Sequence, residues 1–380
     1  MARIVILGGG FGGVSAAHHL RLFAPEHEVV LAARDPTFMM GFRKNAELVG
    51  GEPMEGGRRP LSALEDRGVR VVQGTVTQVD AEAHAAHVDG RTVEGDALVV
   101  ALGAEVVPDA VPGLAEHGRN AYDPAEVPAS AGDLAALEEG RVVIGIFGAP
   151  YTCPPAPYEL ALLASEAAEA RGARVDFTVF TPQPMSLPVL GTAGCEVVES
   201  RLGVRDIKFL ANTKAERVEP GRVVTGNGDI PFDLLLAVPP HRCPGVLVEA
   251  GLAEPGGWVK VDPRTVETAA EGVHAVGDCT QIALATGQPM PKAGVLAEGE
   301  GRVVAERIAA RLAGIEPEGT WGGEGACYLE VGGGQAMMVR GRFLAEPAPE
   351  VELTEASPRY LEDKARYEAE RLDEWFGPAG

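Results

Sequence analysis

The glycine pattern Gly8-x-Gly10-x-x-Gly13, at the start of the chain, constrains the fold more than any other feature. It follows a short apolar run over residues 3–7, which predicts a buried parallel strand, and it precedes a helix expected over residues 14–23. In this context the glycines allow a tight turn and bring the backbone close to a pyrophosphate at the helix N-terminus. The pattern predicts a doubly wound α/β sheet and a dinucleotide site that includes Gly8, Gly10, Phe11, Gly12 and Gly13.

The second strand leaves the contact to the adenosine ribose open. This strand is expected over residues 28–33, and the acidic residue that usually holds the ribose at its end is replaced by Ala33, with Arg34 and Asp35 next. A further buried strand over residues 96–102 leads into a glycine. We expect this part of the cofactor site to contain Arg34, Val76, Ala101 and Gly103.

A second group of residues, far along the chain, points to FAD. Gly277-Asp278 ends a strand-like run, and Asp278 there indicates a contact to the ribityl and pyrophosphate groups, although a turn cap is the simpler alternative. Lys292 lies just before a long helix expected over residues 294–312, so that its side chain and the helix dipole can face a flavin carbonyl. NAD alone needs no such distant contribution, and we therefore predict FAD.

A second strand–helix–strand unit is expected over residues 142–147, 156–171 and 174–180. The loop after its first strand, residues 148–159, carries prolines where a dinucleotide site needs glycines, and proline has no N–H to offer a phosphate. The unit is therefore a second Rossmann-like domain in which NAD(P)H binding is disfavoured. Downstream, Asn227-Gly228 predicts a hairpin turn before the apolar run over residues 234–238.

This loop places Cys153 just before a helix, where a thiol has a lowered pKa and is a better nucleophile. A structural cysteine is the alternative. Glu159, on the same helix, is an acid–base candidate or else a solvated acid of the first turn. His241 is a weaker acid–base candidate, with a surface loop residue as the alternative, and Arg43 and Lys44 are candidate contacts to flavin or acceptor.

Charge and composition exclude several classes of protein. Lys plus Arg number 33 and Asp plus Glu number 55, and a net charge of −22 repels nucleic-acid phosphates. No apolar run is long enough to span a bilayer, and no export signal is recognised. Five widely spaced cysteines do not form a disulfide scaffold, and no metal site is predicted. We expect a cytoplasmic protein, and leave open a peripheral contact with the inner face of the membrane and a homodimer.

The motifs together resemble the sulfide:quinone oxidoreductase and flavocytochrome c sulfide dehydrogenase family, which has the two-domain fold of the disulfide reductases. The segment from Cys153 to Glu159 is similar to the family's first redox cysteine. Ala326-Cys327-Tyr328, before the glycines 332–334, is similar to its second. The resemblance covers residues 1 to about 345. It implies FAD, a Cys153–Cys327 disulfide over the flavin, a small sulfur substrate, and a quinone or protein as electron acceptor.

The chain departs from the family at two places. No thiol occurs over residues 38–42, where the flavocytochrome subunit attaches its flavin, so that FAD is expected to bind non-covalently. Quinone-reducing members carry a third cysteine, which Cys195, Cys243 and Cys279 do not match, and an apolar C-terminal helix pair. The final helix here, expected from Ser357, is amphipathic but acidic, and favours packing on the body or on a second subunit over membrane docking.

The resemblance also implies a mechanism. Hydrosulfide attacks the disulfide, Cys153 carries the sulfane sulfur, and Cys327 supplies the thiolate that meets the flavin. Two alternatives stay open: a type II NADH dehydrogenase with the same fold, and a flavoprotein redox sensor or electron-transfer subunit. The expected organisation is an FAD-binding domain over residues 1–110 and 251–315, a second Rossmann-like domain over 111–250, and a small C-terminal α+β region over 316–380.

Overall fold

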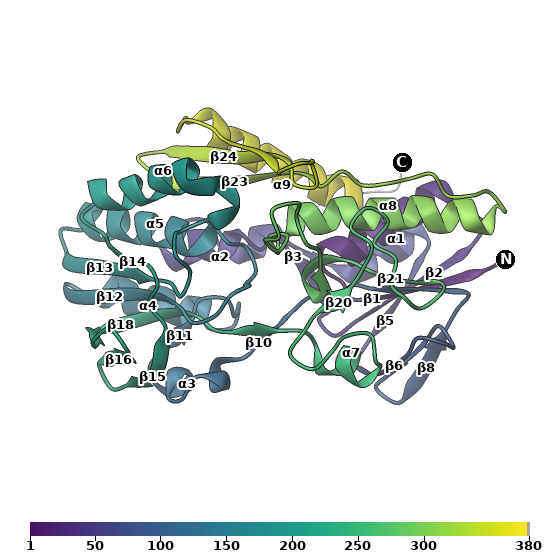
Figure 1. The fold of residues 1–380 in the computed structure, drawn as a ribbon, viewed down its shortest axis with the longest axis horizontal. Helices are drawn as coiled ribbons and strands as arrows, with labels where there is room; N and C mark the ends of the chain where they lie inside the picture. Colours follow the sequence, from purple (N-terminus) through teal and green to yellow (C-terminus); the bar gives the residue numbers. More distant parts are fainter. Residues whose placement is uncertain (378–380) are drawn as a thin grey trace.

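A computed structural model describes residues 1–377 of the chain, and two parallel five-stranded sheets form its two halves (Figure 1). The first sheet has the strand order β21-β9-β1-β2-β5, and all its neighbours pair in parallel. Its strands are β1 (Arg3–Leu7), β2 (Glu28–Ala33), β5 (Val69–Gln73), β9 (Ala97–Val100) and β21 (Val273–Ala275). The doubly wound sheet predicted from the glycine pattern is confirmed.

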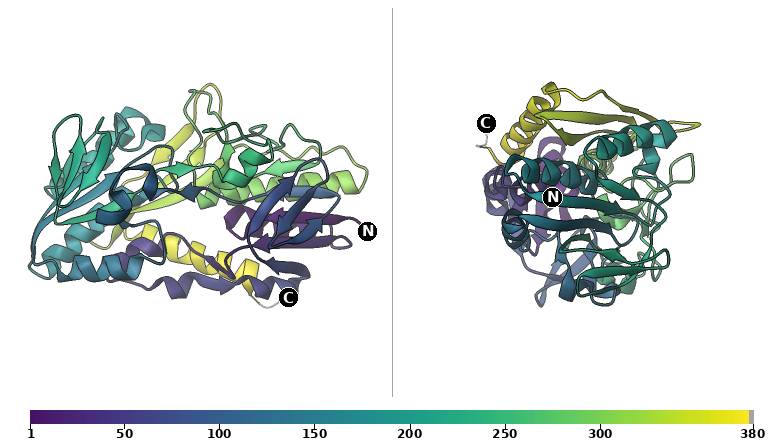
Figure 2. Two further views of the ribbon diagram at one scale, coloured as in Figure 1. Left: turned by 90° about the horizontal axis from the view of Figure 1, so that it is seen from below. Right: turned by 90° about the vertical axis from the view of Figure 1, so that its left-hand side faces the viewer.

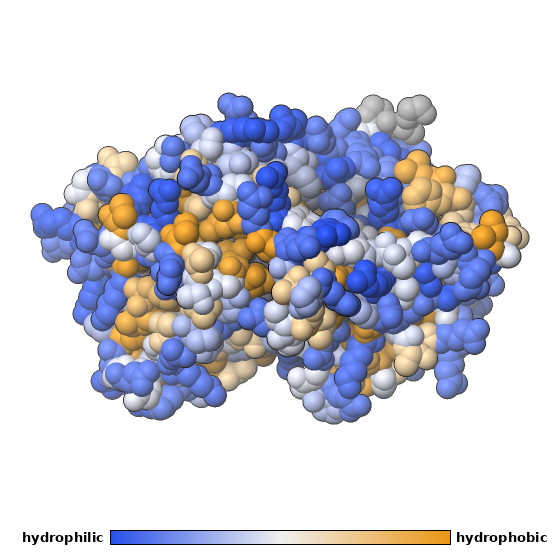
Figure 3. Space-filling view, turned by 45° about the horizontal axis from the view of Figure 1, so that its top comes forward, coloured by the Kyte–Doolittle hydropathy of each residue, from blue (hydrophilic) through white to orange (hydrophobic). Residues whose placement is uncertain are grey.

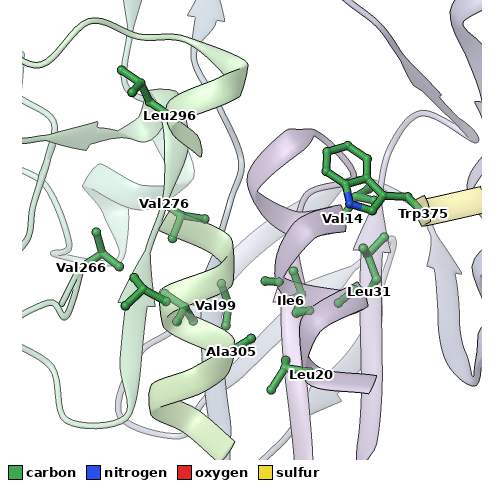
Figure 4. Close-up of a cluster of buried hydrophobic side chains, with 14 of the residues drawn as sticks. Ile6, Val14, Leu20, Leu31, Val99, Val266, Val276, Leu296, Ala305 and Trp375 are labelled. Atoms are coloured by element: carbon green, nitrogen blue, oxygen red, sulfur yellow. The ribbon is translucent and has the colours of Figure 1, made fainter. Parts of the chain in front are cut away.

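Helices α1 (Phe11–Phe23) and α8 (Gly294–Leu312) lie side by side on one face of this sheet (Figure 4). They approach so closely that a Cβ on Gly301 would lie 2.4 Å from the carbonyl oxygen of Gly12. The alternate side chains of β1 and β2 face a small antiparallel sheet and α7 (Gly245–Glu249) on the other side. That sheet contains β6 (Val76–Asp80), β7 (Ala85–Val88) and β8 (Arg91–Glu94).

The second parallel sheet has the order β11-β18-β12-β13-β14. It contains β11 (Arg119–Asn120), β12 (Glu139–Ile146), β13 (Arg174–Phe180), β14 (Lys208–Leu210) and β18 (Leu234–Val238). One face packs on helices α5 (Ala156–Ala170) and α6 (Gly191–Val204), and the other on β15 (Ala215–Glu219), β16 (Arg222–Thr225) and β17 (Ile230–Pro231). Three short helices lie outside these sheets: α2 (Arg43–Leu48), α3 (Leu114–His117) and α4 (Val127–Ala136). Three two-stranded pairs connect the larger elements: β3 (Thr37–Met39) with β4 (Arg58–Pro60), β10 (Glu105–Val106) with β19 (His241–Arg242), and β20 (Val259–Lys260) with β22 (Thr280–Gln281).

A C-terminal antiparallel sheet and the last helix close the molecule (Figure 2). The sheet consists of β23 (Glu324–Gly332), β24 (Gln335–Arg342) and β25 (Glu350–Leu353), with the predicted glycine hairpin between the first two. Helix α9 (Arg359–Phe376) packs on the body, and its fully buried Trp375 contacts Phe11 and Phe38 edge to face. In the described residues 1–377, no helix has the length and apolar character needed to cross a bilayer.

Two local predictions need correction. The first helix begins at Phe11 rather than at residue 14, because the glycine turn itself forms the first helical turn. The Asn227-Gly228 hairpin joins β16 to β17 instead of to residues 234–238. Those five residues are all buried and form β18, which pairs in parallel with β12 in the middle of the second sheet. An apolar run of this kind belongs to a strand that is covered on both faces.

Candidate active site

The glycine turn after β1 combines tight packing with an open space. A Cβ on Gly8, which has φ +119°, would lie 2.0 Å from the carbonyl oxygen of Ala101, and a Cβ on Gly13 would lie 1.9 Å from that of Gly8. At Gly10, by contrast, a Cβ would meet nothing within 4 Å. Gly8 and Gly13 are therefore needed to form the turn, while Gly10 leaves room for a ligand to approach the backbone.

This space belongs to a long cleft along the C-terminal ends of the first sheet. A cavity of about 770 Å³ is lined by the turn, by the end of β2 and by the start of the loop after β9. It shares Gly10, Ala101, Gly103 and Tyr122 with a second cavity of about 290 Å³, which reaches between the two halves of the molecule. Such a continuous cleft has the form that a dinucleotide requires, with its phosphates at the N-terminus of α1.

The structure brings together most of the residues predicted to bind the cofactor. The larger cavity is lined by Gly8, Gly10, Arg34, Val76, Ala101 and Gly103. The inner cavity is lined by Gly10, Phe11, Gly12, Ala101, Gly103, Gly277, Asp278 and Lys292. Gly13 lines neither cavity and contributes through its packing on Gly8. The residues present therefore fit FAD, and the inner cavity, which Asp278 and Lys292 line, would hold its flavin end.

The two predicted redox cysteines meet at this inner cavity. Cys153 lies in the loop between β12 and α5 with φ +50°, held by a hydrogen bond from its N–H to the carbonyl oxygen of Lys292 at 2.7 Å. Cys327 lies on β23, in the C-terminal sheet. No disulfide joins the two cysteines in this structure, and each side chain is near enough to the other to shift its pKa.

The expected lowering of the Cys153 pKa is wrong. The interaction with the Cys327 side chain, and then burial, raise the pKa of Cys153, and the same side-chain interaction lowers the pKa of Cys327. Cys153 also precedes the first residue of α5, Ala156, so that the helix dipole acts on it only weakly. Within the pair, the interaction therefore favours the proton on Cys153 and the thiolate form on Cys327.

Glu159 is buried at 4% exposure, which excludes the solvated acid considered above. Its carboxylate accepts hydrogen bonds from the Asn45 side chain at 3.1 Å and from the Glu330 N–H at 2.9 Å. Burial raises the pKa of Glu159, and the ammonium of Lys364 lowers it. Glu159 is therefore a carboxyl group held in place beside the thiol pair, as an acid–base group requires.

Lys364 is a site residue that the sequence did not reveal. It comes from α9, is 7% exposed, and places its Nζ 2.6 Å from Glu330 Oε1 and 3.7 Å from Glu159 Oε1. Its charge also lowers the pKa of Cys327. The amphipathic pattern of the final helix indicated packing, but neither carboxylate partner is close to it in the sequence.

Two lysines that line the inner cavity, Lys292 and Lys44, are held by neutral groups. Lys292 Nζ donates to the carbonyl oxygens of Asp278 and Thr280 at 2.6 and 3.0 Å, and lies 3.5 Å from the Trp258 ring centre. Lys44 lines the same cavity and donates to the Tyr122 carbonyl oxygen at 3.1 Å. Burial lowers the pKa of both lysines. The Lys292 ammonium is thus directed at backbone carbonyls on the cavity wall.

Two weaker candidates have structural roles. Arg43 binds Glu368 of α9, with 2.9 Å between Nη2 and Oε2, and so fastens that helix. His241 Nδ1–H donates to the Pro239 carbonyl oxygen at 2.8 Å, and its Nε2 lies 3.2 Å from the Thr152 hydroxyl. Burial lowers the pKa of His241 to about 4, which keeps the ring neutral near pH 7. Neither residue lines the two cavities.

The two parallel Rossmann-like sheets, the cleft along the first of them and the thiol pair at its inner end define a flavoprotein oxidoreductase of the disulfide-reductase type. The chain belongs to the pyridine nucleotide-disulphide oxidoreductase family, whose model matches residues 2–301. This family binds FAD.

Two proteins with similar sequences and one solved structure are all sulfide:quinone oxidoreductases. The sulfide-quinone reductase of Aquifex aeolicus is 27% identical over 337 residues, which cover 80% of this chain and 75% of that protein. The mitochondrial sulfide:quinone oxidoreductase of Mus musculus is 21% identical over 364 residues, which cover 90% and 79%. The solved structure of the Aquifex aeolicus sulfide:quinone oxidoreductase has a TM-score of 0.89 at 23% identity, and the match covers 100% of this chain and 92% of that one. The protein is thus similar to sulfide:quinone oxidoreductases in sequence and in fold.

Proposed function

We propose that this protein oxidises sulfide with a Cys153–Cys327 disulfide and passes the electrons through non-covalently bound FAD to a quinone or another acceptor. The observation that carries the proposal is that both cysteines line the inner cavity at the end of the cleft. Two cysteines from distant segments, one on a loop and one on β23, come together there and shift each other's pKa. FAD, when bound, supplies a two-electron acceptor next to them.

The reaction starts from the disulfide. Hydrosulfide attacks the Cys153 sulfur, the bond between the two cysteine sulfurs breaks, and Cys327 leaves as a thiolate while Cys153 becomes a persulfide. The lowered pKa of Cys327 supports this direction, because the thiol of lower pKa is the better leaving group. The Cys327 thiolate is then the group that would face FAD, which would supply the two-electron acceptor.

The surrounding residues prepare the site for these steps. Glu159 lies beside the pair to take or return a proton, and Lys364 fixes its orientation and favours the Cys327 thiolate. Tyr122 donates from its hydroxyl to the Cys153 carbonyl oxygen at 3.2 Å and so steadies the loop. Around Cys153 the loop has prolines and the buried Tyr151 where a nicotinamide dinucleotide would need glycines, which argues against the NADH dehydrogenase alternative.

An anaerobic titration tests the proposal. Visible flavin absorbance is followed after adding sulfide to one sample of the holoprotein and NADH to another. We expect bleaching by sulfide alone, its loss in Cys153→Ser and in Cys327→Ser, and its retention in Cys195→Ser, which alters a buried thiol in the second core. Bleaching by NADH alone would overturn the proposal in favour of a dehydrogenase. Absence of steady-state turnover with sulfide and a quinone analogue would favour a redox sensor.

A further inference from the structure

A cluster of two histidines and a glutamate lies where α1 meets α9. One ring nitrogen each of His18 and His19 and a carboxylate oxygen of Glu374 all lie within 4.8 Å of one another. The histidines are consecutive residues of α1, and Glu374 lies in the last turn of α9. Within residues 1–377, no other three side chains of the metal-binding types come together in this way. None of the three lines the cofactor cavities, so that the cluster is a separate feature of the molecule.

Both histidines are in the form that binds a metal. Burial lowers the pKa of His18 to about 4 and also lowers the pKa of His19, so that both rings are neutral near pH 7. Only a neutral imidazole has a lone pair for a metal ion. His19 Nδ1 lies 2.8 Å from the Ser15 carbonyl oxygen, which can only accept a hydrogen bond, so that Nδ1 carries the proton and Nε2 keeps its lone pair. A hydrogen bond of this kind on the other nitrogen orients metal-binding histidines in proteins.

The glutamate presents one oxygen to the histidines and is held by the other. Glu374 Oε1 lies 3.3 Å from His18 Nε2. Because His18 is neutral, no full ion pair joins these two side chains. The second oxygen, Oε2, binds Arg371, whose Nε lies 2.9 Å from Glu298 Oε1. Arg371 therefore positions the carboxylate from behind, as the hydrogen-bond partners of metal-binding carboxylates do.

We propose that His18, His19 and Glu374 bind a divalent metal ion of the zinc class, which joins the last turn of α9 to α1. Two imidazoles and one carboxylate are a ligand set that suits Zn²⁺. Bonds of about 2.0–2.2 Å to a tetrahedral ion place the ligand atoms roughly 3.4 Å apart, so that small side-chain rotations close the site. Three protein ligands leave a fourth position for water. Water can reach it, because the Glu374 side chain is 38% exposed and the surface over α9, along the upper edge of Figure 3, is mainly hydrophilic.

An ion at this place reinforces a contact that supports the cofactor turn. Trp375, the next residue after Glu374, packs its fully buried ring edge to face on Phe11, the first residue of α1. Helix α9 therefore meets α1 both at the glycine turn, where the phosphates of FAD would lie, and at the histidines about two turns later. We expect the ion to raise the thermal stability of the holoprotein and to slow the release of FAD. This inference does not depend on which molecule donates electrons.

Nearby arginines oppose the ion and offer a way to tune its affinity. Burial is the main cause of the low histidine pKa values, but the charges of Arg67 and Arg371 at His18, and of Arg302 and Arg371 at His19, lower them further. The same charges repel a cation. Arg302 is exposed on α8, so that Arg302→Gln removes a charge without disturbing the core. We expect this variant to bind Zn²⁺ about two- to fivefold more tightly, in the range of single exposed charge interactions.

Calorimetric titration with Zn²⁺ tests the site. The parent for all variants is the FAD-loaded protein with Cys153→Ser and Cys327→Ser, because the thiol pair would itself bind zinc. We expect one Zn²⁺ per chain, and binding weakened about tenfold or more in His19→Ala and in Glu374→Gln. His87→Ala, which alters a half-buried histidine of β7 outside the cluster, should bind as the parent does. Zn²⁺ should also raise the melting temperature of the parent and of His87→Ala, but not that of His19→Ala.

The rate of FAD release, followed by flavin fluorescence, tests whether the ion joins the two helices. Saturating Zn²⁺ should slow release about twofold or more in the parent and leave it unchanged in His19→Ala. Equal zinc binding in the parent, His19→Ala and Glu374→Gln would refute the site. Binding that is lost in these variants, with an unchanged release rate in the parent, would refute the joining of α9 to α1.

The remaining outcomes keep the test decisive. If His19→Ala does not fold, Glu374→Gln and Arg302→Gln should still shift the zinc affinity in opposite directions, and a shift in the same direction would overturn the proposal. A failure of sulfide to bleach the wild-type flavin would refute the proposed function and leave the metal site standing.

Discussion

Replacing Lys364 with methionine removes the one ammonium that faces both Glu159 and Glu330 in the described structure. The substitution keeps the length of the apolar stem, but leaves Glu159, 4% exposed, without its counter-charge. Breaking a buried ion pair by removing one partner typically costs about 3–5 kcal/mol, because the remaining charge must be neutralised or hydrated. We therefore expect the free energy of unfolding of the holoprotein to fall by about 3–5 kcal/mol.

Urea unfolding measures this loss against a surface control. Arg340 pairs with Glu352 at 3.1 Å, with both side chains more than half exposed, so that Arg340→Met should cost at most about 1 kcal/mol. The double variant Lys364→Met with Glu159→Gln should recover part of the loss, because the unpaired carboxylate is gone. The reasoning is refuted if Lys364→Met costs no more than Arg340→Met.

The same substitution has a chemical readout. Lys364 lowers the pKa of Cys327, so that its removal should shift the pH profile of Cys327 alkylation, measured with Cys153→Ser as background, to higher pH. Arg340→Met should leave this profile in place. A purely structural role of Lys364 would change stability without moving the alkylation profile.

Three further changes have distinct expected results. Gly8→Ala should destabilise even the apoprotein by about 3 kcal/mol or more, because the added Cβ would overlap the Ala101 carbonyl oxygen at a φ of +119°. Gly10→Ala should keep the fold and lose FAD on gel filtration, because its Cβ meets only the space left for the ligand. Loss of folding in both variants would contradict this difference. His274 is buried with both ring nitrogens lacking a hydrogen-bond partner among the described residues, and burial lowers its pKa to about 4. As the pH falls, the unfolded chain therefore binds a proton at this histidine before the folded chain does. The stability of the wild type should fall by up to about 3 kcal/mol between pH 6.5 and 4, and His274→Leu should flatten this part of the curve of unfolding free energy against pH. Trp375→Ala should lower the free energy of unfolding by about 3–5 kcal/mol, because the ring is fully buried. It should also speed the release of FAD, measured by flavin fluorescence, because the ring contacts Phe11 at the glycine turn. An unchanged rate of FAD release would refute this supporting role of Trp375.

The cofactor cleft and the first sheet could be predicted because their signals are local. The runs over β1 and β2 are uninterrupted strand signals, and Gly8 and Gly13 are needed by contacts at the turn after β1. Helix α8 likewise has the predicted bounds, 294–312, because Gly294 and Gly314 lie at its two ends. For these elements, neighbouring residues already decide the conformation.

Tertiary structure decided the chemistry of the thiols and the pairing of distant segments. The position of Cys153 before a helix suggested a lowered pKa of its thiol. The interaction with Cys327, which lies on β23 far along the chain, raises this pKa instead. The run over β18 read locally as the second arm of a hairpin, and its burial on both faces placed it in a parallel sheet instead. Lys364 enters the site only because α9 folds back along both halves of the molecule. By itself, the sequence determined most of the strands and turns, and it predicted the residues that are proposed to carry the chemistry. The charges and protons of those residues depend on groups brought close by folding, since electrostatic and hydrogen-bond energies follow distance in space rather than separation along the chain.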